Sequence, residues 1–115
     1  MRVFLYGTLL DPATLAARSG DPALPARCRP AVLHGWRRVA LAGTPYPTLR
    51  PHHSAHTPGL LADIGPAALR RLTAYEGPAY RLTRVVVATE QGDSVAHAWI
   101  APGGTQRPWN PETPR

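Results

Sequence analysis

Ten glycines and fourteen prolines interrupt this 115-residue chain, and they constrain its fold more than any other feature. Such a share without a collagen-like period predicts many turns and short helices and strands. Hydrophobic residues make up 43% of the chain and charged residues 17%, which is typical of a globular protein rather than a disordered one. The length suffices for one domain with a single hydrophobic core and is too short for two.

The charge of the chain is strongly basic. Thirteen arginines, no lysine and seven acidic residues give a net charge of +6, which favours acidic partners, nucleic acid among them. The arginines are nevertheless spread from Arg2 to Arg115, and no run of five or more occurs. A dispersed, solvated surface is therefore favoured over a nucleic-acid-binding patch.

The cysteine content and the hydropathy of the chain indicate its compartment. Cys28 is alone, so the chain forms no internal disulfide and lacks the paired cysteines of zinc ribbons, which suits a reducing compartment. The apolar start over residues 1–6 is shorter than the core of a signal peptide, and no later stretch approaches membrane-spanning length. We expect a soluble, cytoplasmic protein without a membrane partner.

The first third of the chain predicts a strand, a turn and a helix. Residues 3–6 are strand formers that end at Gly7, which predicts a strand running into a tight turn. The pair at 11–12, an aspartate followed by proline, predicts the start of a short helix over residues 13–18. Glycine and proline then predict a loop over residues 19–30.

The middle of the chain predicts interrupted strands. Residues 31–34 and 36–42 are expected as two strand segments broken at Gly35, where a bulge or bend would curve the sheet. Four prolines between residues 43 and 58 exclude a helix and argue against a central strand, so we expect a loop there. Strand character returns over residues 59–64.

The last third predicts a helix over residues 66–74 and a hairpin whose strands cover residues 80–89 and 95–101. The order of elements indicates an α+β fold, a small mixed sheet that curls toward a barrel with short flanking helices. A doubly wound α/β fold is less favoured, because few helices separate the strands and no glycine-rich nucleotide-binding pattern occurs.

The composition changes after Pro102 to glycine, proline and polar residues. We therefore expect one folded domain over residues 1–102 and a loosely held C-terminal tail over residues 103–115, with Trp109 as the residue able to dock.

The turn formed by Tyr6, Gly7, Thr8 and Leu9 is the first candidate site. Successive free amides in a turn make a concave site for anions, and a glycine lets a carboxylate or a developing oxyanion approach the backbone. An ordinary strand-to-helix turn is the alternative, and the spacing of the residues leaves both interpretations open.

Glu76 is the second candidate. It follows a predicted helix, whose terminal carbonyl groups repel negative charge, and Tyr75 and Tyr80 on either side would add burial. Both effects raise the pKa of a carboxyl group, as a general base working near neutral pH requires. An exposed glutamate in a turn is the alternative.

Histidines provide a third candidate, since His52, His53 and His56 offer three imidazoles to zinc or nickel. An irregular loop with no acidic residue or cysteine nearby favours solvated histidines, and we expect no metal site. His34 and His97 are expected as residues of the sheet.

Two motifs together resemble the γ-glutamylcyclotransferase-like superfamily, close to its AIG2-like and γ-glutamylamine cyclotransferase members. They are Tyr6-Gly7-Thr8-Leu9 and the segment from Tyr75-Glu76-Gly77 to Tyr80. The resemblance covers roughly residues 2–101 and also takes in the segments at 34–38, 46–49 and 59–61.

This resemblance implies a small mixed barrel with a pocket at one rim. It implies that amides of Tyr6, Gly7, Thr8 and Leu9 hold the α-carboxylate of a γ-glutamyl substrate, and that Glu76 is the general acid and base. The implied reaction, of the transferase or lyase type, cyclises a γ-glutamyl amine or peptide to 5-oxoproline and releases the amine without a cofactor. A non-catalytic AIG2-like module that binds a small molecule or a protein is the alternative.

Overall fold

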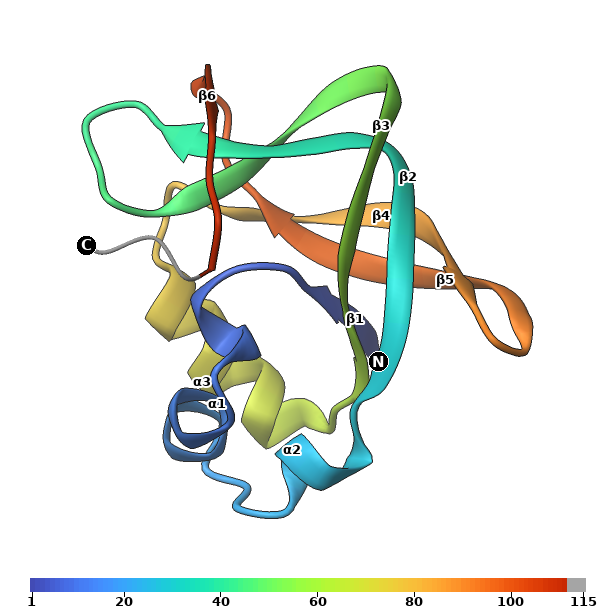
Figure 1. Cartoon of the computed structure of the whole chain (residues 1–115). Coiled ribbons are helices and arrows are strands. Elements are labelled where there is room, and N and C mark those ends of the chain that lie inside the picture. The colour runs from blue at the N-terminus through green and yellow to red at the C-terminus, as the bar shows by residue number, and fades with distance from the viewer. Residues whose placement is uncertain (112–115) are drawn as a thin grey trace.

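The computed structural model describes residues 1–111 and shows a sheet with helices gathered at one end (Figure 1). Its elements in chain order are β1 (Arg2–Leu5), the 3-10 turn η1 (Thr8–Leu10), α1 (Pro12–Ser19), α2 (Leu24–Arg27), β2 (Arg29–Leu41), β3 (Pro47–Asp63), α3 (Pro66–Glu76), β4 (Arg81–Thr89), β5 (Gly92–Ile100) and β6 (Gly104–Pro108).

The strands close into a barrel. Hydrogen bonding joins them in the order β3-β1-β5-β4-β2-β6, and β3 also pairs with β2, which closes a ring of five strands and leaves β6 attached to β2. The pairing of β1 with β5 is parallel, whereas the other pairings are antiparallel. The expectation of a curled mixed sheet with short flanking helices is confirmed.

β1 is buried on both faces because its side chains alternate between two hydrophobic cores. Phe4 and, just after the strand, Tyr6 belong to the core inside the barrel, which side chains from all five strands of the ring fill. Val3 and Leu5 belong to a second core that packs against Leu15 of α1 and the helix that follows β3. The continuous apolar run at the start of the chain therefore joins the barrel to the helices.

β2 confirms the bulge expected at Gly35. The register with β3 shifts between His34 and Trp36, and Gly35 has a φ of +84°, a backbone conformation that favours glycine. The two expected segments are therefore one strand with a bend, and the bend lets β2 pair with β3 along nearly its whole length.

The prediction of a loop over residues 43–58 is wrong, because β3 is a strand from Pro47 to Asp63. β1 pairs with β3 only over residues 60–63, so the prolines at positions 47, 51 and 58 lie where β2 is the single hydrogen-bonded neighbour. A proline nitrogen that faces away from the only partner strand costs no ladder hydrogen bond. All three prolines are therefore tolerated in the part of β3 that pairs with β2 alone.

The helices begin as expected and end later. Asp11 caps α1, since its side chain accepts a hydrogen bond from the Thr14 amide at 2.9 Å. α3 continues two residues past the expected end at residue 74 and includes Glu76. The segment expected as a loop over residues 19–30 contains the short helix α2.

The C-terminal segment is held to the sheet, so the expectation of a loose tail is wrong for residues 104–109. β6 pairs with β2, and the buried Trp109 donates from Nε1 to the Pro45 carbonyl at 2.9 Å. The docking expected of Trp109 is confirmed, whereas residues 112–115 lie outside the described part of the chain. Among residues 1–111, no helix has the length and apolar character needed to cross a membrane.

Gly59 offers a test of how tightly the barrel closes. A Cβ at this position would overlap the Leu5 carbonyl oxygen and lie 2.8 Å from Cζ of Phe4, both on β1. We expect Gly59→Ala to lower the free energy of unfolding by about 3 kcal/mol, because packed backbone cannot move aside. Urea denaturation followed by circular dichroism measures the change.

Gly65→Ala is the matched control, because a Cβ there meets nothing within 4 Å. Its expected cost is below about 1 kcal/mol, the usual difference between alanine and glycine at a helix N-cap. Equal losses in the two variants would contradict the close approach of β1 and β3.

Candidate active site

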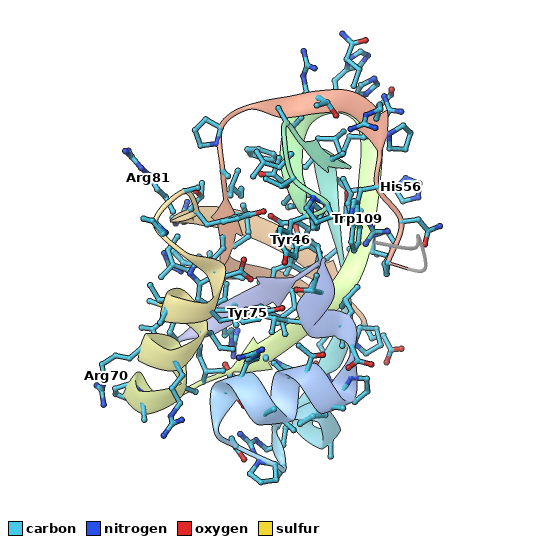
Figure 2. All side chains as sticks on the ribbon, turned by 90° about the vertical axis from the view of Figure 1, so that its left-hand side faces the viewer. Tyr46, His56, Arg70, Tyr75, Arg81 and Trp109 are labelled. Atoms are coloured by element: carbon cyan, nitrogen blue, oxygen red, sulfur yellow. The ribbon has the colours of Figure 1, made fainter. Side chains whose placement is uncertain are left out.

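A cavity of about 150 Å³ lies at the rim of the barrel, beside the helices. It is lined by Phe4, Leu5, Tyr6, Gly7, Thr8, Leu9, Tyr46, Pro47, Tyr75, Glu76, Tyr80 and Trp99. In Figure 2, Tyr46 lies above Tyr75, between the strands at the top and the helices below. All five residues expected at the site, four from the turn and one from the end of α3, therefore line one pocket.

The turn after β1 presents free amides. Its carbonyls are used, since Gly7 O accepts from the Leu10 amide at 3.0 Å and Thr8 O accepts from the Asp11 amide at 3.3 Å. The amides of Gly7, Thr8 and Leu9 donate to no acceptor among residues 1–111. Three successive N–H groups on a pocket wall form the kind of concave site that binds an anion.

Contacts with β5, α3 and β3 hold this turn in place. The Tyr6 hydroxyl donates to the Trp99 carbonyl of β5 at 2.5 Å, and burial raises the pKa of this phenol above its usual range. Thr8 Oγ1 and the Tyr75 hydroxyl of α3 share a hydrogen bond of 2.9 Å. Gly7 has no room for a side chain, because a Cβ would lie 2.8 Å from Cγ of Pro47. The turn is therefore fixed before any ligand binds.

Glu76 is the last residue of α3, which ends where Gly77 adopts a φ of +87°. Burial raises the pKa of its carboxyl from 4.5 to about 7. The expected direction is confirmed, and desolvation rather than the helix terminus is the cause. Because the residue is partly buried and lines the cavity, it is not the exposed turn glutamate of the alternative interpretation.

Two further tyrosines line the cavity. The Tyr80 hydroxyl donates to the Pro47 carbonyl at 2.6 Å, and burial together with the charge of Glu76 raises its pKa to about 12. Tyr46 lines the cavity while 47% of its surface remains exposed, so it stands at the mouth. The sequence reasoning missed Tyr46 as a site residue, although it lies in a segment that carries the family resemblance.

The histidines take no part in this pocket. His52, His53 and His56 are exposed on β3, a strand rather than the expected loop, and His52 and His53 lie where its pairing with β2 is interrupted. The rings of His52 and His53 stack at 5.6 Å, and those of His34 and His56 lie 6.1 Å apart. No group of three or more histidine, cysteine or acidic side chains in the described part of the chain is arranged to hold a metal ion.

A small closed barrel whose rim pocket is lined both by a turn with unbonded amides and by a partly buried acid defines a class of α+β proteins. Residues 3–114 match the family model described as gamma-glutamyl cyclotransferase, AIG2-like, and the chain belongs to this family.

A curated relative, protein AIG2 C of Arabidopsis thaliana, is 33% identical in an alignment of 106 positions that covers 85% of this chain. The chain spans 61% of the length of that relative. A solution structure of an Arabidopsis thaliana protein is similar with a TM-score of 0.77 and 27% identity, covering 95% of this chain and 68% of that one. A gamma-glutamyl cyclotransferase structure has a TM-score of 0.75 and 16% identity over 91% of this chain and 68% of its own, a likeness in fold.

The burial of Glu76 predicts a pH-dependent loss of stability. Between pH 4.5 and about 7 the unfolded chain has released a proton that the folded carboxyl still holds, so rising pH favours the unfolded state. Below this window both states are protonated, and above it the penalty is complete. From about pH 4 to about pH 8, the stability of the wild type should fall by on the order of 3 kcal/mol relative to Glu76→Gln.

Urea denaturation of both proteins at several pH values measures this difference. Glu90→Gln, at the exposed end of the β4–β5 hairpin, is the control and should follow the wild type. A constant difference between the wild type and Glu76→Gln across the pH range would show that the carboxyl is not buried in solution.

Proposed function

We propose that the rim pocket cyclises a γ-glutamyl amine or peptide to 5-oxoproline and releases the amine. The observation that carries this proposal is that Glu76, with a pKa of about 7, lines the same cavity as the unbonded amides of Gly7, Thr8 and Leu9. Membership in the gamma-glutamyl cyclotransferase, AIG2-like family supports the class of reaction.

The substrate supplies its own nucleophile. Its α-amine attacks the γ-carbonyl carbon, a new C–N bond closes the five-membered lactam, and the C–N bond to the leaving amine breaks. No water is consumed, and no electrons leave the substrate. Holding the two reacting groups of one molecule in attack geometry can supply several kcal/mol of the barrier, on the order of 7 in favourable cases.

Glu76 moves the proton in this scheme. Its carboxylate accepts a proton from the α-ammonium, which frees the lone pair for attack, and the carboxylic acid returns this proton to the leaving nitrogen. The ring nitrogen loses a second proton as the lactam forms, and the released amine takes up a proton and leaves as an ammonium ion. A pKa of about 7 leaves both forms populated at neutral pH, so the same group serves as base and then as acid.

The turn orients the substrate. An α-carboxylate placed against the amides of Gly7, Thr8 and Leu9 would use three donors that have no acceptor among residues 1–111. A cavity of this volume holds a group about the size of a benzene ring, which matches the glutamyl portion. The leaving amine then extends past Tyr46 toward solvent.

Turnover tests the role of Glu76. With a panel of γ-glutamyl amines and peptides, the wild type should release 5-oxoproline, and Glu76→Gln should be slower by on the order of 10²- to 10⁴-fold, the usual contribution of a positioned proton donor and acceptor. Chromatographic quantification of 5-oxoproline measures both rates, with Glu90→Gln as the control.

Equal rates in the wild type and Glu76→Gln would sink the assignment of Glu76. Thermal stabilisation of the wild type by 5-oxoproline without turnover of any substrate would favour the alternative, a non-catalytic module that binds a small molecule.

The pH dependence of the reaction gives a separate test. Because the ionised carboxylate starts the reaction, kcat/KM of the wild type should rise tenfold per pH unit below about pH 7 and then level as Glu76 becomes fully ionised. Initial rates from about pH 5 to about pH 9 trace this limb. A profile without a limb near neutrality, or one that Glu76→Gln retains, would contradict the proposed base.

A further inference from the structure

Arg38 holds the backbone of the turn from behind the pocket. Its Nη1 donates to the Tyr6 carbonyl at 2.9 Å and, at 3.4 Å, to the Pro58 carbonyl of β3, while its Nε donates to the Trp109 carbonyl at 3.1 Å. The guanidinium is half-buried and takes part in no ion pair in the described part of the chain. Its donors are thus used on backbone carbonyls from three distant segments.

The hydrogen bond from Arg38 to Tyr6 bears directly on the amide of the next residue. The Tyr6 carbonyl and the Gly7 N–H belong to one peptide unit, which is trans, so they point in opposite directions. Arg38 is not among the residues that line the cavity, whereas Gly7 is. A carbonyl fixed toward Arg38 therefore turns the Gly7 N–H away from Arg38, and Gly7 itself lines the cavity.

The same hydrogen bond strengthens this N–H as a donor. A cation at the carbonyl oxygen polarises the peptide unit and increases the partial positive charge on its amide hydrogen. The guanidinium stays charged throughout the physiological range, so the polarisation is constant.

Two hydrogen bonds with Trp109 hold Arg38 itself in place. The Trp109 carbonyl accepts from Nε of Arg38, and the Trp109 amide donates to the Arg38 carbonyl at 3.2 Å. Its indole donates to the Pro45 carbonyl, two residues before Pro47, which lines the cavity beside Gly7. The buried Trp109 is therefore tied both to Arg38 and to the segment that leads to Pro47.

We propose that Arg38, anchored by the Trp109 carbonyl, is a positioning residue that orients and polarises the Tyr6–Gly7 peptide so that the pocket selects ligands bearing a carboxylate. This inference rests on the proposed function, in which the turn binds the α-carboxylate of the substrate. Arg38 acts through the backbone of the turn and does not touch the substrate.

Selectivity for a carboxylate over a carboxamide tests the role more sharply than stability does. 5-Oxoproline and its primary amide, 5-oxoprolinamide, differ only in the group that the turn would hold. The wild type should bind the acid more tightly than the amide. The selectivity is the Kd of the amide divided by the Kd of the acid, both measured by isothermal titration calorimetry. In Arg38→Gln this ratio should fall about tenfold, the usual effect of losing a hydrogen bond that involves a charged group.

Arg37→Gln is the matched control, because the neighbouring residue of a strand points to the opposite face, and the Arg37 side chain makes no hydrogen bond among residues 1–111. Arg37→Gln removes the same charge as Arg38→Gln and should keep the wild-type ratio of the Kd values for the amide and the acid. Arg38→Lys keeps the charge but replaces the guanidinium fork, so a single ammonium cannot serve both Tyr6 and Trp109, and the ratio should again fall.

The outcomes separate the two proposals. A wild-type ratio in Arg38→Gln or Arg38→Lys overturns the positioning role and leaves the proposed function standing. If Arg38→Gln does not fold, Arg38→Lys decides alone, a reduced ratio supporting the role and an unchanged ratio overturning it. A wild-type protein that binds neither ligand and turns over no γ-glutamyl compound overturns the proposed function, and this inference with it.

Discussion

The first strand has a hydrogen-bonded strand on each side and a hydrophobic core on each face. β1 lies between β3 and β5, its side chains fill the barrel on one face, and on the other they pack against the helices. A strand restrained in all four directions cannot shift its register, because a slip by one residue would exchange the two faces. The turn that follows it therefore starts from a fixed point, and the direction of its free amides is set by the fold.

The fold as a whole also determines the environment of the Glu76 carboxyl. A desolvated carboxylate costs stability, and Glu76 forms no ion pair among residues 1–111, so the packing of the fold as a whole offsets this cost. Because the cost appears only when the group ionises, the site trades stability for a carboxyl that changes its protonation state near neutral pH. Functional sites commonly show perturbed pKa values for this reason.

Local patterns predicted the elements whose cause is local. The strand over residues 3–6, the helix capped by Asp11, the bulge at Gly35 and the C-terminal hairpin follow from residue types within a few positions of each other. The prolines of β3 led to a wrong expectation because their tolerance depends on which neighbour strand pairs with them, a property of the closed barrel.

The site shows the same division. The spacing of the residues left the turn and Glu76 as two unconnected candidates. Only the family resemblance predicted that they form one site, and the structure shows both in the lining of one pocket. The strand β6 and the roles of Tyr46 and Arg38 could not be predicted from the sequence. Each depends on a partner far away in the chain, and no hydrophobic period in a polar or proline-rich segment reveals such a partner. The raised pKa of Glu76 was predictable in direction, but its cause depends on burial by residues far away in the chain.

The parallel pairing of β1 with β5 has a consequence for how the protein is made. Val3 pairs with His97, so β1 waits for a strand that is synthesised long after it. Translation proceeds from the N-terminus, and long-range pairings of this kind form slowly. β1 therefore stays without one of its two partner strands until the β4–β5 hairpin has left the exit tunnel, and the pocket, whose lining includes Trp99 of β5, takes shape only then.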